Sequence, residues 1–259
     1  MKRTLIISFL AIAAAGCGTT MTDNNRPESV NRNVNSAANA NASANTNAAP
    51  VAPAAGVKVT APSDHKFDAA GIPQGWRWID VDAANGPVKY DTSGGSLKII
   101  VPSGKDMFGE NRTAPHMLQG IEGDFQIETR VKVDPKDDYQ GAGLFVYKDA
   151  DNYLRLERAF GGVGGSGSGI RLDARTKDDY KAIATPDQVV TAAKTVDLKL
   201  IRTGNKFIAF WRLDEESEWK EVGEFDSDYP DTVQVGIIAC NTGEDIPVEF
   251  SYIKLAPQT

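Results

Sequence analysis

The sequence predicts an all-β fold in which two antiparallel sheets pack as a sandwich. Three observations lead to this prediction. From Trp76 onward, apolar and polar residues alternate with a period of two, which is typical of strands that bury one face. Turn signals rich in Gly, Asp and Asn separate these runs at short intervals. Apart from a short segment near residues 187–193, no run has the spacing of an amphipathic helix.

The first element in the chain is a leader, residues 1–16. Its positive start contains Lys2 and Arg3, a short apolar run follows, and small residues stand directly before Cys17. This pattern predicts a lipoprotein signal peptide, so that Cys17 becomes the acylated N-terminus. The alternative is an ordinary secretory peptide in which Cys17 is incidental. The apolar run is too short to span a bilayer.

Acylation at Cys17 predicts where the protein resides. Several acyl chains on one residue hold a protein stably at a membrane, which predicts a lipid-anchored protein of the bacterial cell envelope. Gly18 follows the cysteine in place of aspartate, which favours the outer membrane if the cell has two membranes.

The second element, residues 17–62, is a predicted tether. It consists mostly of Asn, Ala, Ser, Thr and Pro, with almost no large apolar side chain. Such a stretch cannot bury enough surface to offset the entropy lost on ordering, so we expect it to be disordered. The predicted β-sandwich domain follows over residues 63–257.

The strands of this domain are expected in the following order. Residues 125–133, FQIETRVKV, show the pattern most clearly, because Phe125, Ile127, Val131 and Val133 share one face. Trp211 and Trp219 also lie in alternating runs and are expected in the core. The predicted strands cover residues 96–101, 125–133, 143–147, 152–158, 169–175, 196–202, 206–213, 218–225, 232–238 and 248–255.

Charge and cysteine content argue against two kinds of function, nucleic-acid binding and cysteine chemistry. The net charge of −7 at pH 7 argues against binding to nucleic acid, which requires clustered Lys and Arg. Beyond Cys17 the only cysteine is Cys240, which ends the apolar run VQVGIIAC and is expected to be an inert core residue.

Several segments resemble a known family. GDFQIETRVKV and QGAGLFVYKDADNYLRLER resemble the central signature of concanavalin A-like jelly-roll domains. With GIPQGWRWID and NRTAPHMLQ, the chain is similar to an uncharacterised bacterial group related to a yeast protein named for regulation of enolase, and to the C-terminal accessory domain of some β-xylosidases. The resemblance covers residues 64–255. It implies a jelly-roll sandwich of the lectin–glucanase type, but transfers no activity.

The polar face of one predicted sheet is the candidate binding surface. Aromatic rings beside guanidinium and carboxylate groups suit sugars, which offer a C–H face for stacking and hydroxyls for hydrogen bonding. We expect Arg155→Ala to abolish glycan binding and to leave thermal unfolding nearly unchanged. The alternative is a half-exposed sheet joined by salt bridges. The candidate ligand contacts are Arg130, Tyr147, Tyr153, Arg155, Glu157 and Arg171.

Catalytic motifs are scarce. His65 and His116 are the only histidines, too few for a Ser-His-Asp triad or a zinc centre, and His116 is expected at a strand edge or in a loop. Glu128 and Glu157 could form the carboxylate pair of a glycoside hydrolase if they faced each other. Nearby Arg130 and Arg155 favour ion pairs instead.

Two loops resemble ligand motifs. The glycine-rich residues 162–167 formally match a dinucleotide fingerprint, but a strand follows where the fingerprint needs a helix, so no nucleotide is expected. Residues 149–152 begin like a calcium-binding EF-hand loop, which then fails at Tyr153, Leu154 and Phe160. A calcium site assembled from separate loops remains open.

Taken together, these patterns predict a membrane-anchored extracytoplasmic lipoprotein. Its lectin-like, non-catalytic domain would bind carbohydrate or another envelope polymer on a concave sheet face. A glycoside hydrolase-like enzyme of the same fold and a structural or protein-interaction lipoprotein are the alternatives.

Overall fold

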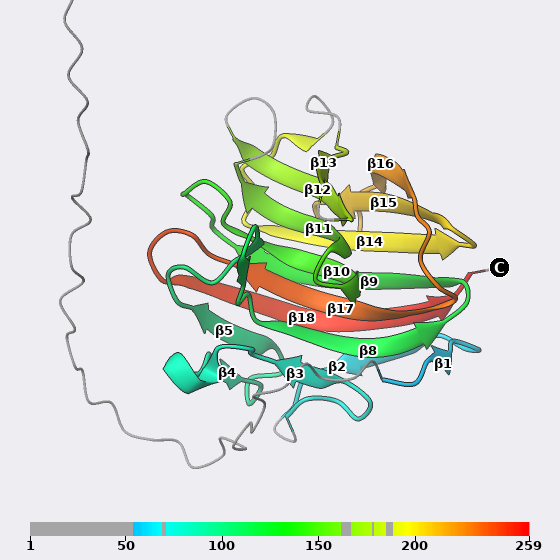
Figure 1. Ribbon diagram of the computed structural model, residues 1–259, viewed down its shortest axis with the longest axis horizontal. Helices are drawn as coiled ribbons and strands as arrows, with labels where there is room; N and C mark the ends of the chain where they lie inside the picture. Colours follow the sequence, from blue (N-terminus) through cyan, green and yellow to red (C-terminus); the bar gives the residue numbers. More distant parts are fainter. Residues whose placement is uncertain (1–53, 69–70, 162–166, 178, 185–188, 259) are drawn as a thin grey trace, which may run out of the picture. The chain divides into compact units, whose positions relative to one another are not determined.

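Two sheets of eight strands each form the β-sandwich in the computed structural model (Figure 1). The structure describes residues 54–68, 71–161, 167–177, 179–184 and 189–258, all within one compact unit. Every pairing between named strands is antiparallel except that of β1 with β8. The predicted all-β sandwich is therefore confirmed. No helix in this described part of the chain is long and apolar enough to cross a membrane.

The first sheet has the strand order β1-β8-β17-β10-β11-β12-β13, and β3 also pairs with β8. Its strands are β1 (Val57–Lys58), β3 (Arg77–Ile79), β8 (His116–Glu122), β10 (Gly141–Asp149), β11 (Asn152–Phe160), β12 (Ser168–Thr176), β13 (Asp179–Ala182) and β17 (Thr232–Cys240).

The second sheet has the order β16-β15-β14-β9-β18-β5-β4, and β2 also pairs with β18. Its strands are β2 (Ser63–Lys66), β4 (Tyr90–Asp91), β5 (Leu97–Val101), β9 (Phe125–Val133), β14 (Thr195–Thr203), β15 (Lys206–Arg212), β16 (Lys220–Asp226) and β18 (Ile246–Pro257). The last two strands of the chain occupy interior positions, with β17 between β8 and β10 and β18 between β9 and β5.

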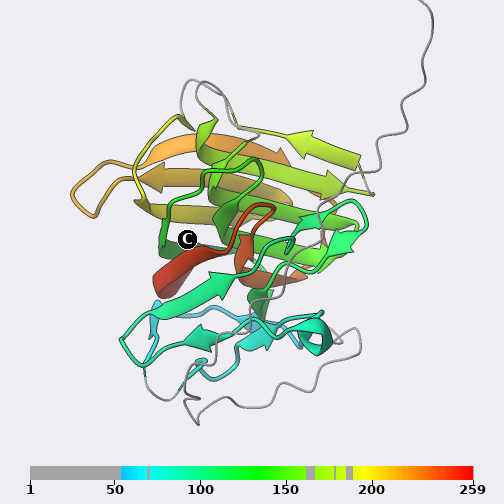
Figure 2. The same ribbon diagram turned by 90° about the vertical axis from the view of Figure 1, so that its left-hand side faces the viewer.

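The two remaining elements are small. A 3-10 turn spans Ala83–Asn85, and a separate hairpin pairs β6 (Met107–Phe108) with β7 (Asn111–Arg112). This hairpin lies against the first sheet (Figure 2). The two are joined by a hydrogen bond that the Tyr153 hydroxyl of β11 donates to the Met107 carbonyl.

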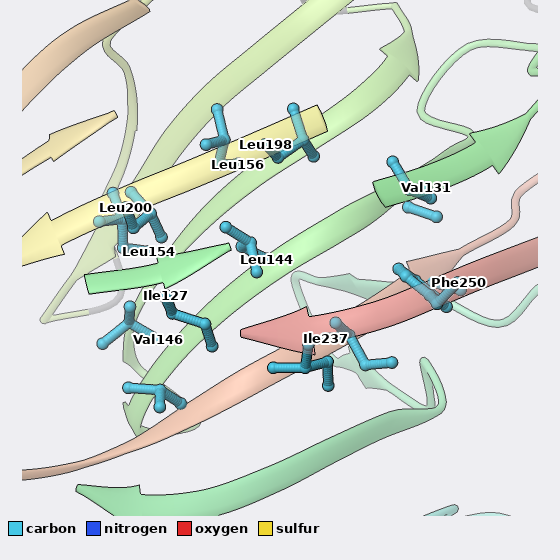
Figure 3. Close-up of a cluster of buried hydrophobic side chains, with 14 of the residues drawn as sticks. Ile127, Val131, Leu144, Val146, Leu154, Leu156, Leu198, Leu200, Ile237 and Phe250 are labelled. Atoms are coloured by element: carbon cyan, nitrogen blue, oxygen red, sulfur yellow. The ribbon is translucent and has the colours of Figure 1, made fainter. Parts of the chain in front are cut away.

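The core lies between the two sheets and follows the predicted alternation. In β9 the side chains of Phe125, Ile127, Val131 and Val133 are all buried, as the sequence predicts. Figure 3 shows leucines of β10, β11 and β14 meeting across the gap between the sheets. Trp211 also lies in this core.

Gly143 and Gly236 in the first sheet have no space for a side chain. A Cβ at Gly143 would lie 2.0 Å from the Leu156 carbonyl oxygen, and one at Gly236 would lie 1.8 Å from that of Met117. Since atoms cannot approach so closely, β10 and β17 require glycine where they pass their neighbours.

Some features differ from the sequence-based expectations. β1 pairs with β8 through Val57 and Ile121, so paired structure begins inside the predicted tether. Trp219 is half-buried rather than in the core. Its indole lies outside the sandwich, where Lys199 Nζ is 4.1 Å from the ring centroid. Residues 1–53, including the predicted signal and Cys17, lie outside the described residues, as do 162–166 of the glycine-rich loop and 187–188 of the short helical segment.

Candidate functional site

The structure brings together five of the six candidate ligand contacts on the outer face of the first sheet, the face turned away from the other sheet. Tyr147 of β10 is opposite Tyr153 of β11. Two residues further along, Arg155 is opposite Asp173 of β12. The other two of the five, Glu157 and Arg171, are also opposite each other.

Arg130 does not belong to this group, and its expected position is wrong. It lies in β9 of the second sheet, opposite Asp197 of β14. Its Nε donates to Asp197 Oδ1 at 2.7 Å, and Arg212 Nε donates to the other carboxylate oxygen at 2.9 Å. The alternation in β9 was predicted correctly, but alternation within a strand does not show which sheet the strand joins.

Four charged side chains on the first sheet form a closed network, which we call the Arg–Asp–Arg–Glu network. Arg155 donates to both carboxylate oxygens of Asp173, at 2.9 and 3.0 Å. Arg171 donates to Glu157 Oε2 at 2.6 and 3.1 Å, and its Nε lies 3.2 Å from Asp173 Oδ2. The four formal charges sum to zero.

This network is sealed from solvent. Its four residues are at most 3% exposed. The β6–β7 hairpin covers part of the same face, where Met107, Phe145 and Tyr153 belong to a second apolar cluster. Unpaired charges would be costly in such surroundings, so the mutual pairing explains how the network is tolerated.

Burial and the neighbouring charges shift the pKa values of the groups in and beside the network. For Arg155, burial alone would lower the pKa, but Asp173 and Glu157 outweigh it and raise the pKa well above its usual value. Burial likewise opposes ionisation of Glu157, but Arg171 and Arg155 hold its pKa below the usual value. Burial, reinforced by Glu157, raises the pKa of Cys240 well above that of a free thiol. Cys240 is therefore a protonated, buried cysteine, as expected.

The burial changes the roles available to the candidate residues. Arg155 pairs with Asp173, Arg171 pairs with Glu157, and none of the four reaches solvent, so removing one affects folding first. This burial argues against the expectation that Arg155→Ala leaves unfolding unchanged. The carboxylate pair considered for hydrolysis is also not brought together, because Glu128 lies in β9 of the second sheet and Glu157 in β11 of the first.

Partly or fully accessible groups lie around the network and form what we call the aromatic rim: Phe108, Tyr147, Tyr180 and Arg112, with the buried Arg175 next to them. Phe108 and Tyr180 are 50% and 40% exposed, and their rings meet edge to face at a centroid distance of 5.7 Å. The Arg175 guanidinium lies 5.7 Å from the Phe108 centroid. Tyr147 is half-buried, and Arg112 pairs with Asp151 at 3.6 Å.

The sequence reasoning missed Phe108 and Tyr180. Phe108 belongs to a two-residue strand and Tyr180 to a four-residue edge strand, both too short to show alternation. An isolated aromatic residue next to glycine, as in Met107-Phe108-Gly109, was the only available signal.

Other expectations concern histidine and metals. His116 was expected at a strand edge or in a loop; it is the first residue of β8, where it is buried and paired with β17 on one side and β3 on the other. Burial lowers its pKa to about 4. Among the described residues, no group of three or more His, Cys, Asp or Glu side chains could hold a metal ion.

Comparisons with known proteins agree with this architecture. The family described as "Protein of unknown function (DUF1349)" matches residues 84–258. No curated protein matches the chain. A functionally unknown protein from Saccharomyces cerevisiae is 17% identical with a TM-score of 0.57, covering 71% of this chain and 97% of that one.

Two further solved structures share the fold. Xylan β-1,4-xylosidase from Bacillus halodurans C-125 is 17% identical with a TM-score of 0.60, covering 74% of this chain and 38% of the enzyme. The metal-free lectin I-B4 from Griffonia simplicifolia is 10% identical with a TM-score of 0.51, covering 76% of this chain and 100% of the lectin. At these identities the likeness shows the fold alone.

Proposed function

The chain belongs to the DUF1349 family of proteins of unknown function, and from that premise we propose that its β-sandwich binds carbohydrate without catalysing a reaction. The ligand is a glycan or another envelope polymer with sugar-like chemistry. The aromatic rim on the first sheet is the contact surface, and the buried Arg–Asp–Arg–Glu network is its rigid base.

One observation carries this proposal: two exposed rings and the partly exposed Arg112 guanidinium share a single face. Phe108 and Tyr180 offer apolar surface to a sugar ring, and the partly exposed Arg112 of the same hairpin adds a guanidinium group to this surface. The fold shared with a lectin and a xylosidase supports a carbohydrate ligand. The separation of Glu128 and Glu157 in different sheets favours binding over hydrolysis by that pair.

We expect the double substitution Phe108→Ala/Tyr180→Ala to weaken glycan binding roughly tenfold, because each aromatic contact contributes about 0.5–1.5 kcal/mol. A glycan array with the full chain identifies the ligand, and titration calorimetry then measures the dissociation constants. Tyr139→Ala is the matched control, since Tyr139 is also exposed but lies outside the rim. Equal weakening by both variants, or an array without any bound glycan, would reject the rim as a sugar site.

We further propose that acylated Cys17 anchors the protein in the bacterial cell envelope, at the outer membrane where two membranes exist. Residues 18–53 then connect the anchor to the sandwich. The composition of the leader and its position before Cys17 support this proposal.

Cys17→Ala is expected to move the protein from the membrane fraction to the soluble fraction, because a chain without acyl groups loses its anchor. Fractionation with immunodetection, together with mass spectrometry of the N-terminal peptide, checks this. Cys240→Ala is the control and should stay in the membrane fraction. An unmodified Cys17 in the wild-type protein would contradict the proposal.

A further inference from the structure

A row of alternating charges crosses the outer face of the second sheet, on the opposite side of the sandwich from the aromatic rim. The register places Glu128 of β9 between Lys199 of β14 and Lys254 of β18. Lys254 in turn lies opposite Asp64 of β2, and Lys199 lies opposite Phe210 of β15. Because neighbouring strands are about 4.8 Å apart, this row is about 19 Å long.

A groove with a volume of about 290 Å³ follows the row. Glu128, Lys199 and Lys254 line it from the middle strands. Gln126 and Asp64 line it from β9 and β2. It therefore offers ammonium donors, carboxylate acceptors and an amide within one open surface.

Lys199 is the cation with unused hydrogen-bonding capacity. Its ammonium group lies 4.1 Å from the ring centroid of Trp219 and 5.1 Å from that of Phe210. Within the described ranges it has neither a hydrogen-bond acceptor nor an ion-pair partner. Burial lowers the pKa of Lys199, while Glu128 partly opposes this. An anionic ligand group beside Lys199 would supply the missing acceptor.

The neighbouring acidic group is already partly neutralised. Glu128 Oε1 accepts a hydrogen bond from the Tyr252 hydroxyl at 2.8 Å and lies 3.6 Å from Arg212 and 4.0 Å from Lys254. Its remaining lone pairs can accept from ligand hydroxyl groups, so the groove is not simply a site for anions.

The surrounding charge is positive, although the chain as a whole carries −7. The next row across the same strands places Arg212, Asp197, Arg130, Tyr252 and Lys66 opposite one another in turn. The two rows contain five cationic and three anionic side chains. Asp197 is fully buried between Arg130 and Arg212, so it contributes little negative charge to the surface.

We propose that this groove is a second binding site, and that it takes a carboxylated saccharide of the uronic acid type. Lys199 and Lys254 receive the sugar carboxylates, and Glu128 and Asp64 accept hydrogen bonds from the hydroxyls. The half-buried indole of Trp219 helps to hold these cations in place, because Lys199 Nζ lies 4.1 Å and the Arg212 guanidinium 4.3 Å from its ring centroid. An acidic peptide fits less well, because its carboxylates would meet Glu128 and Asp64 without hydroxyl donors to satisfy them.

The test is titration calorimetry of the full chain with a short oligogalacturonate and with its fully methyl-esterified form, which has the same ring and no charge. We expect the acid to bind at least roughly tenfold more tightly than the ester, and this difference to shrink as ionic strength rises. Lys199→Gln should remove most of the difference, and Lys254→Gln should weaken it. Lys206→Gln is the control, because Lys206 is an exposed lysine of β15 paired with Glu224 outside the groove.

Equal affinity for acid and ester overturns the proposal, as does a Lys199→Gln variant that behaves like the Lys206→Gln control. Circular dichroism establishes that each variant is folded. The Phe108→Ala/Tyr180→Ala variant separates the two sites. If it retains oligogalacturonate binding, the groove acts independently of the rim; if it loses this binding, the groove assignment is wrong.

Discussion

Arg155→Ala is expected to lower the free energy of unfolding by about 3–5 kcal/mol. Removing the guanidinium leaves Asp173 and Glu157 in the same sealed space with only Arg171 to compensate them, so one negative charge remains buried. The charge cannot be hydrated without opening the sheet. Urea denaturation of the wild-type and variant proteins, followed by circular dichroism, measures the difference.

Two further variants test whether the burial is the cause. Lys206→Ala removes an ion pair whose side chains are 44% and 45% exposed, and should change the free energy of unfolding far less, because solvent screens such a pair. Arg155→Lys keeps the charge but loses the bidentate contact with Asp173. Its loss of unfolding free energy should lie between those of Lys206→Ala and Arg155→Ala. A loss below about 1 kcal/mol for Arg155→Ala would mean that water reaches the network.

Acid is expected to destabilise the protein through His116, by about 3 kcal/mol between about pH 6.5 and about pH 4. In the unfolded chain the imidazole takes up a proton near its usual pKa of 6.5, whereas burial, with a smaller contribution from Arg77, lowers the folded pKa to about 4. The contribution to stability is therefore complete above the unfolded pKa and is lost as the pH falls through this window. The Nδ1 atom is 2.8 Å from the Ala114 carbonyl oxygen, so the neutral ring donates there.

Urea denaturation at several pH values checks this expectation. His116→Gln should show a flatter dependence of unfolding free energy on pH than the wild type. His65→Gln is the matched control: burial also lowers the pKa of His65, but Asp64 opposes the shift and the ring is only half-buried. Parallel pH profiles for the wild type and His116→Gln would show that carboxylates alone cause the acid sensitivity.

The fold could be predicted from local patterns because the long strands turn one apolar face toward the core between the sheets. Residues 125–133 and 152–158 show this directly, and their predicted bounds agree with β9 and β11 to within two residues. Alternation does not show whether the outer face of a sheet is exposed or covered by another segment. The polar residues of β11 suggested exposure, but the β6–β7 hairpin, whose sequence carries no periodic signal, lies against that face.

Part of the candidate site could also be predicted from the alternation within strands. Tyr147, Tyr153, Arg155, Glu157 and Arg171 were correctly placed on one face, because pairing of neighbouring strands follows from their alternation. The position of Arg130 required knowledge of which sheet β9 joins. Phe108, Tyr180 and the charge row through Lys199 depend on contacts between segments far apart in the chain, which one sequence does not display.

The interior positions of β17 and β18 determine when this domain can fold. In the first sheet β17 joins β8 to β10, and in the second sheet β18 joins β5 to β9. All four partners are synthesised far earlier than the strand that joins them. During synthesis both sheets therefore stay divided until residues 232–257 have left the ribosome. Such non-local pairing makes folding slow, and it keeps the growing chain from closing prematurely around an incomplete core.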